Sequence, residues 1–212
     1  MNKSAILVLF LAIFLAACAD PAANKPKATT ANTQNAAANE KKEIKGGKAL
    51  PITPENSKIE FTGSKVTGSH DGGFKSFKGT IDLVNNKPEE SSVSVNIEMN
   101  SVFTNADGLT KHLQTPDFFD VEKYPKATFA STKIVADAEK GAGNYTITGD
   151  LNLHGTIKSI SFPAKITVGD SDVSVDAEFS INRKDFGIAY AGKADDLIRD
   201  DVVIKLSLKA PK

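Results

Sequence analysis

The sequence predicts an all-β domain, built as a sandwich or a closed barrel, that begins after residue 50. Apolar and polar side chains alternate in about eight short runs, which is the pattern of strands with one buried face and one solvated face. Turn-forming pairs such as Asn85-Asn86 and Gly169-Asp170 separate the runs. Many short strands at such spacing are typical of sandwiches and barrels.

Each predicted strand is marked by the residues of its apolar face. In chain order these are Ile59 and Phe61; Phe77, Ile81 and Leu83; Val93, Val95, Ile97 and Met99; a weaker run around Phe129; Tyr145, Ile147, Leu151 and Leu153; Ile160, Phe162, Ala164 and Ile166; Val173, Val175, Phe179 and Ile181; and Val202, Ile204, Leu206 and Leu208. Alternation alone does not separate a soluble barrel from a membrane-spanning one, whose apolar face points outward. The compact length favours the soluble form. An eight-stranded barrel then holds either a packed core or one small ligand.

One stretch, residues 108–125, interrupts the strand pattern. A short helix is expected around Leu109–Gln114, and Thr115-Pro116 should end it because the residue before a proline avoids helical backbone angles. Phe118 and Phe119 follow. The insert is long for a hairpin loop, and long loops often carry function.

The composition excludes several classes of protein. The chain has 26 Lys plus Arg and 26 Asp plus Glu, so it lacks the net basic charge typical of nucleic-acid binding. It has one cysteine, so no internal disulfide supports the fold. Phenylalanine (12) outnumbers tyrosine (3) and tryptophan is absent, which indicates rings that are buried or that line an apolar space.

The first seventeen residues have the pattern of a secretory signal peptide. Lys3 precedes a run without polar side chains, 5–17, that is shorter than the about 18 residues needed to span a bilayer. Residues 15–18, LAAC, resemble a bacterial lipobox, in which the cysteine receives a diacylglycerol and becomes the first residue of the mature protein. The alternative is ordinary cleavage after Ala19, which would remove the cysteine.

Lipidation of Cys18 predicts a cell-envelope protein that is attached to a bacterial membrane and faces the periplasm or the cell surface. By resemblance to bacterial lipoproteins it would carry three acyl chains, and two or more chains hold a protein stably on a membrane. Ala19 rather than Asp follows the cysteine, so the inner-membrane retention signal of some enteric bacteria is missing. We therefore expect the outer membrane.

Residues 18–50 are expected to form a flexible tether between the acylated cysteine and the domain at 51–212. Ala, Asn, Lys, Thr and Pro dominate this segment, and Ile44 and Leu50 are its only large aliphatic residues. Such a sequence cannot bury enough apolar area to offset the entropy of ordering. A random coil of this length has an end-to-end distance of about 30 Å.

Several motifs within residues 51–212 resemble, in order, the YceI-like polyisoprenoid-binding proteins of bacteria. They are GGFKSFKGTIDL (72–83), SVFT (101–104), HLQTPDFFDVEKYPKATFAST (112–132), GDLNLHGTIKSISFP (149–163), INRKDFGI (181–188) and DVVIKLSLKA (201–210). The resemblance implies an antiparallel, eight-stranded, lipocalin-like barrel with a short helical insert. It also implies a long apolar pore that holds an isoprenoid chain, such as a quinone or a polyprenyl lipid, with no other cofactor.

Seven inward-facing residues are the candidates for the pore lining. They are Phe61, Phe77, Ile97, Phe129, Tyr145, Phe162 and Phe179. Plain core packing is the alternative for each ring. Phe118 and Phe119 either cap one end of the pore or attach the insert to the barrel, and attachment is the favoured interpretation.

His112 and Arg183 are the polar candidates at the pore mouth or in the insert. His112 either fixes the insert through a local hydrogen bond or meets a ligand head group, and Arg183 is interpreted as half of a local ion pair with Asp185. The three histidines are each 42 residues from the next, which is not metal-ligand spacing, so we expect no metal site. Glycines 149, 155 and 187 are interpreted as turn or bulge residues.

The sequence thus predicts a membrane-anchored protein that binds an isoprenoid-like lipid as a carrier or a store. The alternative is a structural or stress-related surface module with a packed core and no ligand. Glycine-rich nucleotide loops, the G-x-S-x-G elbow and the HExxH zinc motif are all missing, so we do not expect an enzyme. A weaker alternative is an enzyme that acts on the bound lipid with His112 as acid or base. The sequence does not decide between a monomer and a homodimer.

Overall fold

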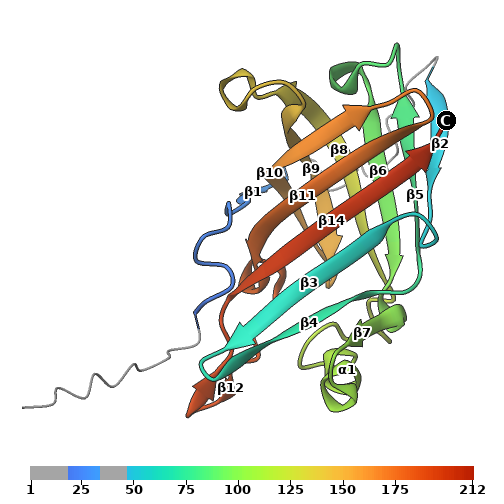
Figure 1. Ribbon diagram of the computed structural model, residues 1–212. Helices are drawn as coiled ribbons and strands as arrows, with labels where there is room; N and C mark the ends of the chain where they lie inside the picture. The colour runs from blue at the N-terminus through green and yellow to red at the C-terminus, as the bar shows by residue number, and fades with distance from the viewer. Residues whose placement is uncertain (1–18, 34–46) are drawn as a thin grey trace, which may run out of the picture.

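The structure, a computed structural model, describes residues 19–33 and 47–212, and its centre is one strongly curled antiparallel sheet (Figure 1). In hydrogen-bonded order the main strands are β2 (Lys48–Ile52), β5 (Phe77–Leu83), β6 (Ser92–Glu98), β8 (Lys126–Ala136), β9 (Asn144–Leu153), β10 (Thr156–Val168), β11 (Asp172–Asn182), β14 (Asp201–Pro211), β3 (Lys58–Lys65), β4 (Gly68–Phe74) and β7 (Val102–Thr104). The twelfth strand, β1 (Thr29–Asn32), pairs with β10. A separate hairpin joins β12 (Gly192–Lys193) and β13 (Asp196–Leu197).

The prediction of an all-β antiparallel fold with a short helical insert is confirmed. All eight alternating runs form strands, namely β3, β5, β6, β8, β9, β10, β11 and β14. The sheet also contains strands that the alternation did not reveal. β4 has the sequence GSHDGGF, in which glycines replace the alternating apolar residues, and β2 has the sequence KALPI, in which a proline interrupts the strand pattern.

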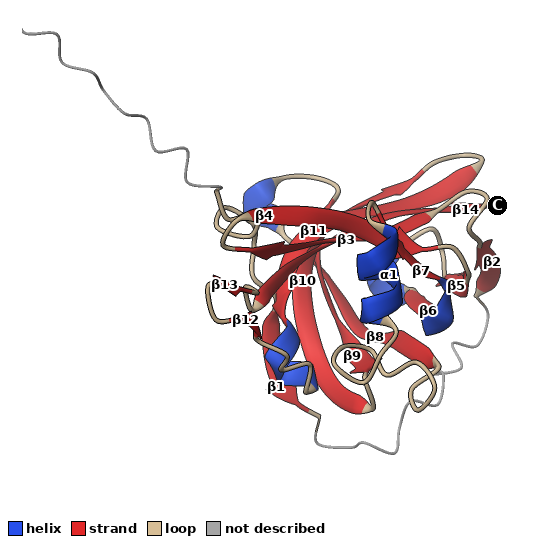
Figure 2. Cartoon of the chain, turned by 90° about the horizontal axis from the view of Figure 1, so that it is seen from below, coloured by secondary structure: helices blue, strands red, loops and turns tan. Residues whose placement is uncertain are grey.

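The sheet curls so that the strands at its two edges, β2 at one and β4 with β7 at the other, come close to other strands of the same sheet. At one end of the sheet order, β2 pairs with β5 and also contacts β14. At the other end, β4 passes through only two residues, Lys75 and Ser76, before it continues as β5. The backbone N–H of Lys75 donates to the Ser101 carbonyl, and that of Glu98 donates to the Ser76 carbonyl. The result is a barrel-like wall around an interior that Figure 2 shows from one end.

Within residues 19–33 and 47–212, five short helices accompany the sheet. The α-helix α1 (Asp107–Leu113) lies in the insert, close to the predicted position, and 3₁₀ turns occur at η1 (Pro88–Glu90), η2 (Met99–Ser101), η3 (Ala138–Lys140) and η4 (Arg183–Phe186). The hydroxyl of Thr110 accepts the backbone N–H of Thr104, which ties α1 to β7. At the other end of α1, the Thr115 hydroxyl donates to the His112 carbonyl, so the helix stops where the Thr-Pro pair predicts.

The first described segment, residues 19–33, is not a free tether. The backbone N–H of Ala28 donates to the Ser180 carbonyl at 2.8 Å, and that of Ser180 donates to the Pro26 carbonyl at 2.8 Å. The Lys27 ammonium pairs with Asp201 at 2.8 Å. The tether prediction is therefore wrong for this segment, because backbone pairing with the barrel supplies the contacts that its side chains lack.

The domain also begins earlier than predicted, because β2 starts at Lys48 and buries Leu50 completely. The signal peptide, the lipobox with Cys18, and residues 34–46 of the expected tether lie outside the described residues. Those predictions stay predictions.

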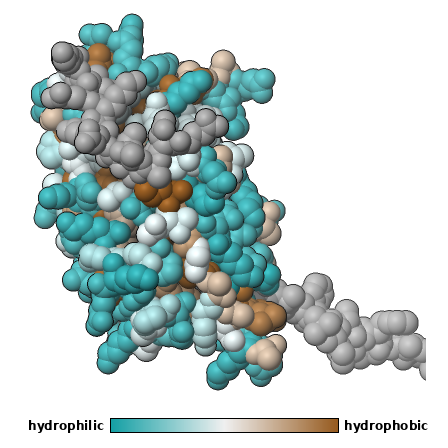
Figure 3. Space-filling view, turned by 180° about the vertical axis from the view of Figure 1, so that it is seen from behind, coloured by the Kyte–Doolittle hydropathy of each residue, from teal (hydrophilic) through white to brown (hydrophobic). Residues whose placement is uncertain are grey.

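The interior contains two apolar clusters. The larger runs through the barrel and includes Ile52, Ile147, Phe162 and Phe179. The smaller joins the insert to the barrel through Phe61, Val102, Leu113, Phe118 and Ile188. On the outside, the face seen in Figure 3 is mostly hydrophilic, with small separate hydrophobic patches. Within the described residues, no helix has both the length and the hydropathy that crossing a membrane requires.

Candidate functional site

The barrel encloses a cavity of about 550 Å³. This volume lies within the range of about 300–1,000 Å³ typical of small-molecule sites. Its wall comes from the inner faces of the long strands and from the insert, and most of the lining side chains are apolar. The apolar residues of the alternating strands therefore line an open space in one part of the barrel and form a packed core in another.

Five of the seven predicted lining residues border the cavity: Phe61, Ile97, Phe129, Phe162 and Phe179. The rings of Phe162 and Phe179 are stacked, with centroids 4.1 Å apart and planes at 12°. Phe129 lies tilted against Phe162 at 5.7 Å. These contacts form a continuous aromatic surface across β8, β10 and β11.

Phe77 and Tyr145 share the inward parity but do not line the cavity. Phe77 packs within the larger cluster, and the cavity lining does not include it. Tyr145 lies at the start of β9, whereas Leu151 and Leu153, which do line the cavity, lie near its end. Six residues of strand span about 20 Å. Alternation along a strand tells which face of the sheet a side chain is on, but not its position along the barrel axis.

Two glycines make room for the rings of the wall. Gly72 on β4 pairs with Phe61 on β3, and a Cβ at Gly72 would lie 2.5 Å from Phe61 Cζ. On β9, a Cβ at Gly149 would lie 2.4 Å from Phe129 Cζ. Gly149 thus serves close packing inside a strand rather than a turn, and its partner Ser131 begins the β-bulge of β8 at Ser131–Lys133, in line with the bulge interpretation. The turn interpretation is confirmed for Gly155 and Gly187, which have φ of 72° and 78°.

The insert closes part of the cavity with aromatic side chains. Phe119 contacts Phe61 and Phe74, with ring centroids 6.5 and 6.2 Å apart. Phe118 is 6% exposed and packs on Tyr190 at 5.4 Å. Both phenylalanines line the cavity and at the same time attach the insert to the barrel, so the two interpretations from sequence hold together.

His112 borders the cavity from the insert. Its Nε2 lies 2.8 Å from Asp117 Oδ2, and its ring packs edge-on against Phe118 at 4.9 Å and against Tyr190 at 5.2 Å. These contacts match the local hydrogen bond that the sequence favours. The imidazole orients the loop that follows α1.

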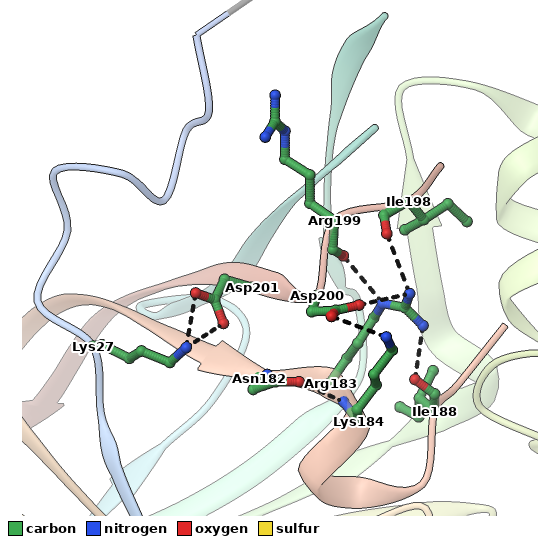
Figure 4. Close-up of polar contacts among 9 residues, drawn as sticks. All are labelled: Lys27, Asn182, Arg183, Lys184, Ile188, Ile198, Arg199, Asp200 and Asp201. Atoms are coloured by element: carbon green, nitrogen blue, oxygen red, sulfur yellow. Dashed lines mark hydrogen bonds and ion pairs between the residues drawn. The ribbon is translucent and has the colours of Figure 1, made fainter. Parts of the chain in front are cut away.

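Arg183 lines the cavity, and its buried guanidinium connects several chain segments (Figure 4). Its guanidinium donates to the carbonyls of Ile188, Arg199 and Ile198 at 2.7, 3.1 and 3.4 Å. The carboxylate beside it is Asp200, at 3.3 Å, so the predicted pairing with Asp185 is wrong. Burial lowers the pKa of Arg183, and the Asp200 carboxylate opposes this shift. Asp200 directly precedes β14, so the partner comes from the segment before that strand and not from the η4 turn of Arg183 itself.

The cavity ends in a polar mouth made by three chain segments. Ser64, Lys65 and His70 come from the β3–β4 hairpin, and Lys193, Asp196 and Arg199 come from the β12–β13 region, while the insert forms the third side. Sequence reasoning missed this group because no local motif brings the segments together.

One ion pair joins the two hairpins across the mouth. The Lys65 ammonium hydrogen-bonds to the Asp196 carboxylate, which also accepts from the hydroxyl of Thr67 at 3.0 Å. The hydrogen bond from Lys65 holds the pKa of Asp196 below its ordinary value, with a smaller contribution from Thr67. The two hairpins are thereby held side by side.

The described residues contain no group of three or more His, Cys, Asp or Glu side chains arranged for a metal ion. The three histidines have separate partners: besides the contact of His112 with Asp117, the Nδ1 of His154 donates to the Phe186 carbonyl, and His70 Nδ1 contacts Asn105 Oδ1. The chemistry of the site is therefore that of an apolar chamber with a charged rim.

Comparison with known proteins agrees with this architecture. A model of the YceI-like domain matches residues 51–210. The chain belongs to the YceI-like family. A related UPF0312 protein of Pseudomonas putida strain W619 is 35% identical over 140 residues, which cover 63% of this chain and 71% of the relative.

Two solved structures share the fold of this YceI-like chain. BcnA of Burkholderia cenocepacia has a TM-score of 0.68 at 23% identity, with 75% of this chain and 99% of that one covered. A polyisoprenoid-binding domain of Saccharophagus degradans has a TM-score of 0.61 at 18% identity, with 78% and 98% covered. At these identities the likeness supports the barrel fold.

Proposed function

We propose that this YceI-like protein holds one isoprenoid-like lipid, a quinone or a polyprenyl chain, inside its barrel and acts as a carrier or a store without converting it. The observation that carries the proposal is the cavity of about 550 Å³ with its apolar wall. The polyisoprenoid-binding domain of Saccharophagus degradans, which shares the fold, supports the same class of ligand.

The energetics of such a site need few polar contacts. Each methylene buried in an apolar wall contributes about 0.8 kcal/mol, so several isoprene units suffice for tight binding. Aromatic faces such as Phe162 and Phe179 contact a flexible chain without fixing its register. One methylene more or less changes affinity little, so we expect weak discrimination of chain length. The polar mouth is the place where a head group would remain in contact with water.

We propose further that Cys18 is acylated and holds the protein on a bacterial membrane, on the outer membrane and facing the periplasm or the cell surface. The lipobox-like sequence and the residue that follows it support this location. A lipid cargo is collected from a membrane, so an anchored binding protein stays close to its source.

The cavity also weighs against the packed-core alternative. A surface module with a packed core would leave no space of this size inside the barrel. For the enzymatic alternative, the described contacts of His112 are a hydrogen bond to Asp117 at 2.8 Å and ring packing against Phe118 and Tyr190, which account for the residue as a structural element of the insert. Product formation from a bound lipid that disappears in His112→Ala would revive the enzymatic alternative.

The direct test is to identify what the protein carries. Native mass spectrometry and organic extraction of the protein purified from its source should reveal a bound isoprenoid lipid. The delipidated protein should then take up quinones and polyprenyl lipids from a panel that also contains fatty acids. A folded protein that carries no lipid and takes up none of the panel would refute the proposal.

A pair of neighbouring substitutions separates binding in the cavity from binding elsewhere. Ala127 on β8 lines the cavity and is 3% exposed, so Ala127→Phe places a ring in the space that the lipid would occupy. Displacing about three methylenes costs about 2.4 kcal/mol, or about fiftyfold in affinity. Thr128→Phe is the matched control, because alternate residues of a strand face opposite sides. Equal affinity in the two variants, measured by titration, would place the ligand outside the cavity.

A further inference from the structure

Two exposed apolar side chains lie next to each other at the mouth of the cavity. Among the described residues, three large hydrophobic side chains are exposed: Val66 (55%), Leu197 (49%) and Val135 (43%). The backbone N–H of Val66 donates to the Leu197 carbonyl at 3.2 Å, so the first two form one patch, the apolar tips, where the β3–β4 turn meets strand β13. Val135 lies near the end of β8, beside Ile134, which lines a different and much smaller space.

The patch is continuous with the cavity. Lys65 and Asp196, the chain neighbours of Val66 and Leu197, line the cavity mouth and hold the two tips together. In Figure 1 the β3–β4 turn, β12 and α1 all lie at the same lower end of the barrel. The apolar tips therefore form the outer edge of the opening through which a ligand would pass.

The described chain also begins at this end. Arg199, two residues after Leu197, places its Nη1 3.4 Å from Asp20 Oδ2. Cys18 precedes Asp20 by two residues in the sequence, and two residues span at most about 7 Å. An acyl chain on that cysteine would therefore enter the membrane close to the mouth, not at the end of a long coil.

We propose that the tips carrying Val66 and Leu197 form a docking surface for a lipid bilayer, which seats the cavity mouth on the membrane beside the anchor. The proposal rests on the proposed lipid-binding function for its purpose. Two apolar side chains give only weak membrane affinity by themselves, but an anchor nearby raises their effective concentration at the bilayer. Lys193 is exposed at the mouth, where lipid head groups would meet the protein, while the Lys65 ammonium is paired with Asp196.

Tryptophan fluorescence can test the orientation, because the chain contains no tryptophan. Val66→Trp, Leu197→Trp and Val135→Trp each introduce one fluorophore at an exposed apolar position. The full-length protein, acylated in a bacterial host or coupled through its single cysteine to a maleimide lipid, is placed on vesicles of phosphatidylethanolamine and phosphatidylglycerol with brominated acyl chains. We expect blue-shifted, quenched emission at positions 66 and 197 and unchanged emission at 135.

Equal quenching at all three positions, or none at 66 and 197, would overturn the docking surface. The signal requires no cargo, so this result is independent of whether the cavity binds a lipid. The experiment therefore distinguishes a failure of docking from a failure of the proposed function.

A second measurement links docking to lipid uptake. The double variant Val66→Asp with Leu197→Asp should slow transfer of a quinone from vesicles to the protein by about tenfold, since charged tips resist entry into the bilayer. Val135→Asp should transfer at the original rate. Uptake from detergent solution should stay unchanged in both variants, because the cavity is intact. Unchanged transfer from vesicles in the double variant would refute the role in uptake, and absence of uptake in every format would refute the proposed function instead.

Discussion

The two ends of the barrel differ in how the same alternating strands fill their interior. At the end away from the mouth, Ile, Val and Leu side chains leave a space of only about 20 Å³. Toward the mouth, phenylalanine rings and the insert surround about 550 Å³. Val93, Ile147 and Val175 border both spaces and mark the boundary between them.

This difference teaches that one sheet can combine close packing in one half with an open chamber in the other. In the packed half, side chains such as Leu50, Ile52 and Val173 are almost completely buried. In the hollow half, many lining residues are only partly buried because one side faces the cavity. An open chamber lacks the close contacts of a packed core. The packed half of the barrel supplies such contacts, and we expect it to contribute more to the stability of the fold.

Removing a leucine from each half gives the sharpest test of this comparison. Leu50 on β2 is 1% exposed and pairs with Ile81, so Leu50→Ala creates a new void and should lower the free energy of unfolding by about 3 kcal/mol. Leu151 on β9 already borders the cavity, so Leu151→Ala enlarges an existing space and should cost about 1 kcal/mol. Urea denaturation of the lipid-free proteins measures both values. Similar losses in the two variants would show that the halves do not differ in packing.

The sequence predicts much of this fold because period-two alternation is a local property. Each of the eight alternating strands, including the weak run around Phe129, follows from residues two apart. Alternation does not reveal whether the interior is packed or hollow, because Phe162 and Ile166 obey the same pattern on β10 yet border different spaces. The family resemblance, not the pattern, predicted the pore.

The substitution with the next largest expected effect concerns the wall of the hollow half. A Cβ at Gly149 would lie 2.4 Å from Phe129 Cζ and 2.5 Å from the Ala130 carbonyl oxygen. Gly149→Ala should therefore push the ring toward the cavity and lower the free energy of unfolding by about 2 kcal/mol. Gly63, which also lines the cavity, has open space around it, so Gly63→Ala should change stability by no more than about 0.5 kcal/mol. Thermal and urea unfolding measure the stability of both variants. An unchanged free energy of unfolding in Gly149→Ala would mean that Phe129 and the strand can shift to accommodate the methyl group at little cost.

The candidate site was harder to predict than the fold because its parts meet only in three dimensions. Lys65 and Asp196 are far apart in the sequence and belong to no motif, yet they form the ion pair across the mouth. Arg183 was visible as a candidate, but its partner Asp200 comes from the segment before the next strand. The attachment of residues 19–33 depends on backbone hydrogen bonds to β10 and to Ser180, which composition does not encode.

The substitution with the smallest expected effect lies on the outer surface of the hollow half of the barrel. Asp150 precedes the cavity-lining Leu151 on β9, so it faces the outside of the same wall. Burial nevertheless raises the pKa of Asp150 above its ordinary value. The folded protein therefore holds the proton on this carboxyl more tightly than the unfolded chain does, and ionisation destabilises the fold as the pH rises through the raised pKa.

Asp150→Asn removes this penalty and should raise the free energy of unfolding at neutral pH by up to about 0.5 kcal/mol. The gain should fall as the pH drops and disappear below about pH 3, where the carboxyl of the original protein is protonated in both states. Urea titrations of both proteins at several pH values measure the difference. A gain that stays constant at low pH would attribute the effect to something other than charge. A loss of stability at neutral pH would mean that the Asp150 carboxylate makes a stabilising contact on the outer surface of the barrel wall.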